Sequence, residues 1–365
     1  MNNSLNAICP YFAMYPLDYP MGVIEKYGAT SVLDPFCGRG TTNMAARLNN
    51  IHSVGIDSSD VAYAISSAKM VNTSPESILR TYDAIVSDCE DVDTPTGEFW
   101  DMMYDPVVLK TVCTVRKALL EECASEEEIA LRGIMLGALH GPMMVNGSSS
   151  YFSNQFPRTF ASKPSYSVRY WKKNDYLKPP NVDVREIVKK RAHRYYSNFL
   201  EPTTGFILKG DSTDRSTFDE LERLNGDRKF DTIITSPPYH GMNTYIPDQW
   251  LRNWFVGGPD SVEYTMRGQT SGRLNTFIKQ LKSVWNNCKR LCSDDARMFV
   301  RFGEIGNKTA DPGEIIRKTF EGTDWIVDSI EGAGMPKKGR RSSESFLKTN
   351  LSDYKEIDVQ VSVDV

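Results

Sequence analysis

The sequence predicts an α/β fold: a Rossmann-like, doubly wound mixed sheet with a helical insertion between its second and third strands. Three observations support this prediction. Short apolar runs alternate with helical patterns over residues 31–71, which is typical of β-α-β units. Helical periodicity then dominates residues 73–200, and strand patterns return after residue 205. At 365 residues, the chain has room for one large domain or two ordinary ones.

The first half of the sheet is predicted from two strand–helix pairs. Ser31–Phe36 is an apolar strand that runs into a glycine turn, and a helix from about Thr41 to Asn49 follows it. The second strand is Ser53–Ile56, and Ser59–Val71 has the pattern of the next helix.

The insertion is predicted to hold three helices and one irregular stretch. The helical patterns cover Val107–Glu122, Glu126–His140 and Val184–Phe199. The stretch Gly141–Pro180 is punctuated by Pro, Ser and Asn, and we expect it to be irregular.

Strand patterns resume after the insertion. They are Gly205–Lys209, Phe230–Ile234, Arg297–Phe302 and a terminal pair, Trp325–Ile330 and Ile357–Val363. We therefore predict one α/β domain made of residues 1–72 and 201–365, with residues 73–200 as a helical, partly basic insertion.

The segment Asp34–Thr42 (D-P-F-C-G-R-G-T-T) joins the first strand to its helix. Gly38 and Gly40 permit positive φ and let a ligand approach the backbone closely. The N-terminus of the following helix offers N–H groups that have no partner within the helix. The pattern predicts a ligand-binding turn, although such turns also use glycine for packing alone.

Asp57 follows the second strand, 17 residues after Gly40. In dinucleotide-binding folds an acid about 20 residues from the glycine turn holds the ribose hydroxyls. The alternative is that Asp57 caps the next helix, because Ser58 and Ser59 follow it.

The segment Thr235–Tyr239 reads T-S-P-P-Y and follows the apolar run Phe230–Ile234. The two prolines end the strand, because proline has no N–H and a fixed φ. The result is a rigid turn that presents the hydroxyl of Ser236 and the ring of Tyr239. The alternative is a proline-stiffened loop without a chemical role.

Together the two turns resemble the amino-group DNA methyltransferases that use S-adenosylmethionine. The serine before Pro-Pro resembles the site-specific enzymes that methylate the N4 amine of cytosine, whereas aspartate or asparagine there usually marks adenine enzymes. The cofactor-binding half stands first, as in one arrangement of that family. The resemblance covers residues 10–70 and 205–302 and says little about residues 73–200.

The resemblance implies a role for each residue of the T-S-P-P-Y turn. Ser236 Oγ and the Pro237 carbonyl accept hydrogen bonds from the target amine, which frees its lone pair for the methyl group. Tyr239 stacks on a base that has swung out of the duplex. The catalytic residues implied are Ser236, Pro237, Pro238 and Tyr239.

The resemblance also implies a cofactor site. In that family an acid after the third strand contacts the adenine end of the cofactor, and an aromatic segment ahead of the first strand holds its methionine part. Asp211 and Tyr15 stand at the matching places. The cofactor-binding residues implied are Tyr15, Asp34, Pro35, Phe36, Gly38, Gly40, Thr41, Thr42, Asp57, Ser58 and Asp211.

Three alternatives stay open at this point. The target base is adenine, methylated at its N6 amine in DNA. The substrate is RNA. Or the chain is a module that binds DNA or the cofactor without catalysis.

Charge is segregated along the chain, whose formal net charge is −4. Between Arg158 and Arg194 there are eleven Lys or Arg and three acids, so this segment is +8 and the rest of the chain is −12. Basic residues interleaved with aromatic ones suit phosphate contact and base stacking, although solvated helix faces give the same pattern. The residues expected to contact DNA are Arg158, Lys172, Lys173, Lys337, Lys338, Arg340 and Arg341.

The remaining expectations concern the compartment and the partners. Seven cysteines without C-x-x-C spacing favour reduced thiols in a cytoplasm, and four scattered histidines give no pattern of metal ligands. The N-terminus lacks the pattern of a signal peptide, and no apolar run approaches the ~20 residues of a membrane span. We expect a cytoplasmic protein that acts on double-stranded DNA and binds no membrane. The resemblance leaves room for a separate restriction endonuclease at the same site.

Overall fold

The computed structural model describes most of the chain. The described residues are 4–11, 15–88, 91–120, 123–142, 150–153, 160–176, 178–198, 200–240, 245–264, 271–303, 311–333 and 356–364. The chain divides into two compact units. One, the helical unit, consists of Met1–Tyr11, Ser67–Leu200 and Thr244–Thr265, and the other, the sheet unit, of Phe12–Ser66, Glu201–Asn243 and Met266–Val365.

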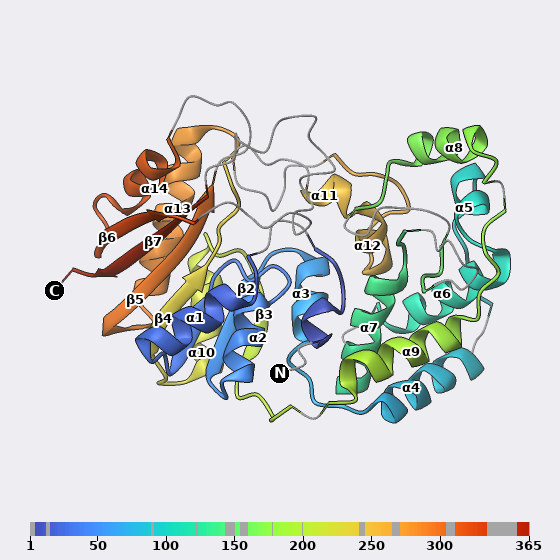
Figure 1. Cartoon of the computed structure of the whole chain (residues 1–365), viewed down its shortest axis with the longest axis horizontal. Helices are drawn as coiled ribbons and strands as arrows, with labels where there is room; N and C mark the ends of the chain where they lie inside the picture. The colour runs from blue at the N-terminus through green and yellow to red at the C-terminus, as the bar shows by residue number, and fades with distance from the viewer. Residues whose placement is uncertain are drawn as a thin grey trace. The chain divides into compact units, whose positions relative to one another are not determined.

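The sheet unit is built on a mixed sheet. Its seven strands in the described residues have the order β3-β2-β1-β4-β5-β7-β6 (Figure 1). Neighbouring strands are parallel from β3 to β5, whereas β7 is antiparallel to both β5 and β6. The strand bounds are β1 Ser31–Asp34, β2 His52–Asp57, β3 Phe206–Lys209, β4 Phe230–Thr235, β5 Cys292–Gly303, β6 Trp325–Gly332 and β7 Glu356–Val363.

The predicted fold class is confirmed. The sheet is doubly wound and mixed, and the helices that form the insertion stand between β2 and β3 in the chain. Some predicted bounds were wrong. Strand β1 ends at Asp34, before the predicted Phe36, because Pro35 cannot continue the ladder. Strand β5 starts at Cys292, five residues before the predicted Arg297.

Strand order creates a switch point between β1 and β4. From β1 the chain moves outward to β2 and β3, and it then returns to the other side of β1 to form β4 and β5. Val32 pairs with Thr232 and Leu33 with Ile233, so the carboxyl ends of β1 and β4 lie side by side. In open α/β sheets ligands bind outside the carboxyl ends of the strands at such a point. The topology therefore marks the place for a site.

Helices cover both faces of this sheet. Helices α10, α13 and α14 share an apolar cluster with the sheet, which includes Phe218 and Trp285. Helix α2 lies on the opposite face, as right-handed crossovers in opposite directions require, and α1, which precedes β1, packs against it (Figure 1). The helix bounds are α1 Asp18–Tyr27, α2 Thr41–Leu48, α3 Asp60–Ser67, α10 Arg215–Asn225, α13 Leu274–Lys289 and α14 Pro312–Phe320.

The helical unit is made of short helices with clear start signals. Ser125 and Glu128 form a capping box at the start of α7, and Asp105 caps α6, whose first residue is Pro106. The helix bounds are η1 Ser4–Ala7, α4 Pro75–Ser87, α5 Glu98–Met103, α6 Pro106–Ala118, α7 Glu126–Ala138, α8 Pro164–Lys173, α9 Val184–Tyr196, α11 Tyr245–Asp248 and α12 Trp250–Phe255. No helix in the described ranges is long and apolar enough to cross a bilayer.

Helix α8 corrects the prediction that Gly141–Pro180 is irregular. It begins with Pro164 at its first turn, and only Ser167 and Trp171 are buried along it. So narrow an apolar stripe gives little periodicity, which is why the helix was not predicted.

Candidate active site

Asp34 joins the ends of β1 and β4. It is the last residue of β1, and its side chain is fully buried. Thr235, the last residue of β4, donates its hydroxyl to Asp34 Oδ1 over 2.7 Å, and the N–H of Phe36 donates to the same oxygen over 3.1 Å. Burial raises the pKa of this carboxyl, while its hydrogen bonds oppose the rise. The start of the glycine turn and the start of the T-S-P-P-Y turn are therefore hydrogen-bonded to one another.

A second link between the same strands runs through Thr42. Its hydroxyl, in the first turn of α2, shares its one proton between the carbonyl of Ile234, 3.2 Å away, and the hydroxyl oxygen of Tyr15. Tyr15 donates to Asp34 Oδ2 over 3.3 Å, and burial raises the pKa of its hydroxyl well above the usual value. The structure thus brings Tyr15, Asp34 and Thr42 together in one buried network, as three of the predicted cofactor-site residues.

The glycine turn takes the backbone shape that its sequence predicts. Gly38 and Gly40 have φ of 51° and 70°, in the left-handed region that favours glycine. A Cβ on Gly40 would also meet Ser66 Cβ at 2.8 Å, so this glycine serves packing as well as backbone shape. Thr41 follows at the start of α2, and its buried hydroxyl has no hydrogen-bond partner among the described residues. A buried hydroxyl in this position at a helix N-terminus fits a polar ligand.

Asp57 holds the glycine turn against the end of β2. Its Oδ2 accepts from the N–H of Gly38 and its Oδ1 from the N–H of Ser59, both over 2.9 Å. Ser59, whose hydroxyl accepts from the N–H of Ala62, is the residue that caps α3. Burial raises the pKa of Asp57 to about 6, and its hydrogen bonds from the backbone oppose the rise. Each carboxylate oxygen can accept a second bond, so Asp57 can take two ligand hydroxyls beside the turn; Ser58 lies exposed next to it.

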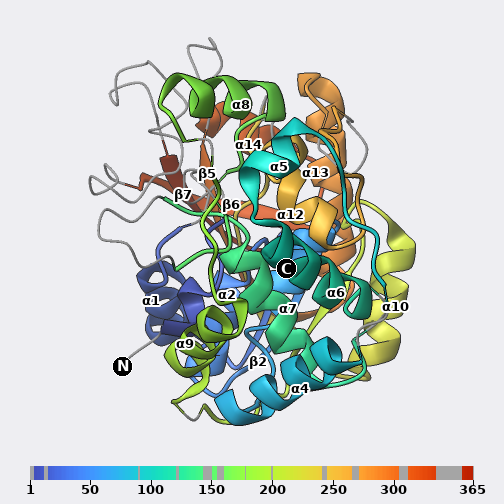
Figure 2. The ribbon, with the colours of Figure 1, turned by 90° about the vertical axis from the view of Figure 1, so that its right-hand side faces the viewer.

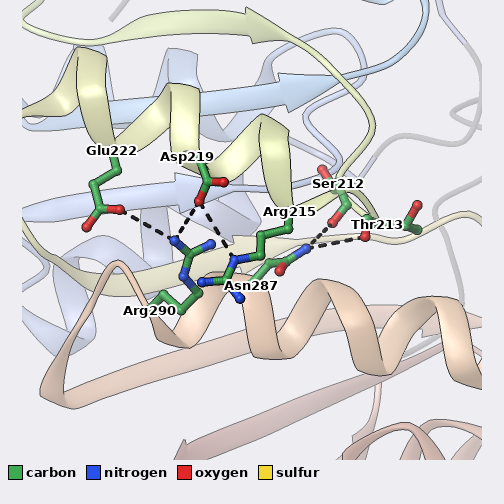
Figure 3. A network of polar contacts seen from close by, with 7 residues as sticks. All are labelled: Ser212, Thr213, Arg215, Asp219, Glu222, Asn287 and Arg290. Atoms are coloured by element: carbon green, nitrogen blue, oxygen red, sulfur yellow. Dashed lines mark hydrogen bonds and ion pairs between the residues drawn. The ribbon is translucent and has the colours of Figure 1, made fainter.

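The loop after β3 is held in place from two sides. Ser212 donates its hydroxyl to the carbonyl of Pro35 over 2.6 Å. Asn287 of α13 donates to the carbonyls of Ser212 and Thr213 over 3.2 and 3.4 Å (Figure 3). Asp211 is exposed at the head of this loop, where its Oδ1 accepts from the N–H and the hydroxyl of Thr213. The sequence did not predict the roles of Ser212 and Asn287.

An ion-pair cluster braces the helices beneath that loop. Arg290, just after α13, reaches Asp219 over 2.7 Å and Glu222 over 3.5 Å, both on α10 (Figure 3). Asp219 also lies 4.0 Å from Arg215 on its own helix. Because α10 starts four residues after Asp211, bracing α10 against α13 helps to fix the position of Asp211.

The T-S-P-P-Y turn leaves the sheet beside β5. Ser236 is half-buried and Pro237 buried, and β4 ends at Thr235 as the prolines predict. The ring of Tyr239 packs against Phe302 of β5 in a T-shaped arrangement, with the ring centroids 5.8 Å apart and the planes at 73°. Its hydroxyl donates to Glu356 Oε1, at the start of β7, over 3.2 Å. Glu356 and Phe302 were not predicted, since both lie far from the turn in the sequence.

The predicted DNA contacts are only partly within the described residues. Arg158, Lys337, Lys338, Arg340 and Arg341 lie outside them. Lys172 and Lys173 are exposed on α8 of the helical unit, and Lys172 pairs with Glu98 over 2.5 Å.

Comparison with known proteins adds little. No family model matches the chain, and no curated protein sequence matches it. Solved structures that match include two of the rRNA methyltransferase aviRa from Streptomyces viridochromogenes. The first has a TM-score of 0.36 and 10% sequence identity, and the match covers 100% of this chain and 94% of that one. The second has a TM-score of 0.33 and 9% identity, and the match covers 97% of this chain and 87% of that one. A third comes from work on the conversion of a disulfide bond into a thioacetal group during echinomycin biosynthesis. It has a TM-score of 0.32 and 10% identity, and the match covers 94% of this chain and 80% of that one. Likeness this slight carries no weight for function.

Proposed function

We propose that this protein transfers a methyl group from S-adenosylmethionine to the N4 amine of cytosine in a specific DNA sequence. The observation that supports this most is the hydrogen bond between Thr235 and Asp34, 2.7 Å long. It ties the two turns that the resemblance assigns to catalysis and to the cofactor. A donor bound at one turn is then within reach of an amine held at the other, which is the arrangement that group transfer needs.

The residues of the sheet unit fit S-adenosylmethionine. Asp57 takes the ribose hydroxyls, and the glycine turn, with the buried Thr41 hydroxyl, lets the cofactor lie close to the backbone. Asp211 is exposed on its braced loop, where its carboxylate can accept further hydrogen bonds from the adenine end of the cofactor. The cofactor supplies an activated methyl group on a positively charged sulfur.

The T-S-P-P-Y turn suits the target amine. Ser236 Oγ and the Pro237 carbonyl accept hydrogen bonds from the two N–H groups of the amine, which frees the nitrogen lone pair for the methyl group. With S-adenosylmethionine bound, the turn would hold the amine nitrogen toward the activated methyl group, and the proton that the amine gives up would pass to water. Tyr239, braced by Phe302, stacks on the extruded base.

Mass analysis of nucleosides tests the proposal. Duplex DNA is incubated with the protein and S-adenosylmethionine that carries a labelled methyl group, then digested to nucleosides. We expect label in N4-methylcytosine with the natural protein and none with Ser236→Ala, while calorimetry gives both the same affinity for the cofactor. Label in N6-methyladenine or only in RNA would overturn the choice of substrate. Cofactor binding without label in any nucleic acid would overturn the enzymatic role.

A further inference from the structure

Helix α8 carries three tyrosines side by side at the surface of the helical unit. Tyr166 and Tyr170, one helical turn apart, stack with their ring centroids 6.3 Å apart and their planes at 18°. Tyr176 continues the row, 6.3 Å from Tyr170 at 34°. Tyr166 is 56% and Tyr170 42% exposed, which is unusual for two adjacent large aromatic side chains. We call this row the tyrosine face.

The end of α8 is shaped so that Tyr176 folds back onto the helix. Asp175 has a φ of 57°, in the left-handed region, and the N–H of Tyr176 donates to the carbonyl of Trp171 over 2.9 Å. This is the Schellman arrangement, in which the chain turns back over the last helical turn. The Asn174 side chain adds a bond to the carbonyl of Tyr170 over 2.7 Å. The third ring is therefore placed by the backbone.

The side of α8 opposite the tyrosine face is buried, and this packing orients the helix. Trp171 is fully buried, with its ring 5.7 Å from that of Phe99 on α5, and Ser167 is buried beside it. Figures 1 and 2 both show α8 lying against α5. Trp171 thus anchors the helix, and it is not available for the base stacking that its place among basic residues suggests.

Positive charge surrounds the tyrosine face. Residues 163–178 hold five Lys or Arg and one acid, a net charge of +4. Lys163 and Lys172 pair with Asp248 and Glu98. Arg169, Lys173 and Lys178 are exposed and make no ion pair with any described residue. A ligand for this face therefore needs flat apolar rings and negative charge together.

We propose that the tyrosine face binds an unpaired stretch of DNA, whose bases stack on Tyr166 and Tyr170 and whose phosphates meet Arg169 and Lys173. Aromatic rings exposed in a row among basic side chains are the features that hold single strands without reading their sequence. An unpaired strand is favoured over a duplex because bases within a duplex have no open face to stack on. The choice of DNA rests on the proposed function, whereas the stacking chemistry does not.

Fluorescence anisotropy with a labelled oligodeoxythymidine strand, without S-adenosylmethionine, tests the inference on the full chain. We expect Tyr166→Ala with Tyr170→Ala to weaken binding about tenfold or more, since stacking is worth ~1–3 kcal/mol per base. Tyr166→Phe with Tyr170→Phe keeps the rings and should bind almost as the natural protein does. The control for loss of surface charge elsewhere is Arg317→Ser with Lys318→Ser, two exposed basic residues on α14, which should bind the strand almost as the natural protein does.

Each outcome decides the question. Unchanged binding by the alanine pair, or an equal loss in the phenylalanine pair, would overturn the stacking role. Loss confined to a duplex or to an RNA strand of the same sequence would overturn the choice of unpaired DNA. If the alanine pair loses strand binding but the natural protein methylates no nucleic acid, the proposed function fails alone. If methylation occurs and the alanine pair binds normally, the tyrosine face fails alone.

Discussion

At the scale of single residues, the carboxyl of Asp34 has a positioning role in addition to the cofactor contact that the resemblance implies. Its carboxyl is buried and hydrogen-bonded to Thr235, Phe36 and Tyr15. Thr235 begins the T-S-P-P-Y turn, and Phe36 lies within the glycine turn that Asp34 begins. Asp34 therefore acts by holding the two turns in position.

Substitution of Asp34 tests this positioning role. Asp34→Ala leaves buried donors on Thr235 and Phe36 unpaired and should lower the free energy of unfolding by about 2–5 kcal/mol. Asp34→Asn keeps an acceptor for both, and burial already disfavours the ionised carboxylate, so its cost should be about 1 kcal/mol or less. Denaturant unfolding measures both, with exposed Asp211→Ala as the control. Equal losses for Asn and Ala would contradict the role.

Asp57 should make cofactor affinity depend on pH. Burial raises its pKa to about 6, so the cofactor-free protein binds a proton there below pH 6. Ribose hydroxyls donate to the ionised carboxylate, hence affinity for S-adenosylmethionine should rise as the pH rises through about 6 and level off above it. Calorimetry across this range measures the effect.

The control for that pH dependence is Asp57→Asn, which does not ionise. Its affinity for S-adenosylmethionine should be about 1–3 kcal/mol weaker at neutral pH and should not change between pH 5 and 7. A variant that keeps both the affinity and the pH dependence of the natural protein would show that Asp57 serves only the glycine turn.

At the scale of elements, the shapes of the two turns could be predicted from local sequence, whereas the residues that contact them could not. Gly38 and Gly40 predict left-handed backbone, and Pro237 and Pro238 predict the end of β4, because these effects act within a few residues. Glu356 accepts a hydrogen bond from Tyr239, which lies 117 positions earlier in the sequence, and no local sequence pattern predicts such a contact. Helix α8 was missed for the opposite reason, since its buried stripe is too narrow to show.

A comparison of alanine substitutions at Gly28 and Gly40 distinguishes the cost of backbone strain from the cost of crowding at Gly40. Gly28, at the end of α1, has a φ of 64° and open space where a Cβ would lie, so Gly28→Ala should cost only about 1–2 kcal/mol of strain. Gly40→Ala adds a clash with the Ser66 backbone and side chain, and it should lose more stability and also cofactor affinity. Thermal unfolding and calorimetry compare them. Equal effects of the two changes would contradict the packing role of Gly40.

Tyr239 should matter for turnover and little for the cofactor. Tyr239→Ala removes the stacking ring and should lower kcat severely while the Kd for S-adenosylmethionine stays nearly unchanged. Tyr239→Phe keeps the ring and loses only the bond to Glu356, so its kcat should fall far less. Single-turnover kinetics on duplex DNA measures both. Parallel loss of cofactor affinity in Tyr239→Ala would count against the stacking role.

At the scale of the whole molecule, the order of the strands is what brings the distant motifs together. Asp34 and Thr235 are 201 positions apart, and the sequence placed Asp34 within one predicted strand and Thr235 directly after another. Their contact depends on β1 and β4 being neighbours, which is decided by the packing of the complete sheet. The insertion between β2 and β3 lengthens the chain between the motifs without separating them in space.

A crystal structure with bound S-adenosylhomocysteine, the product form of the cofactor, would show whether the two turns form one site. We expect the ribose on Asp57, the ligand along the glycine turn, and the sulfur facing Ser236 and Tyr239 across a gap that fits one methyl group and one amine. A ligand seated elsewhere, or with its sulfur turned away from Ser236, would contradict this expectation.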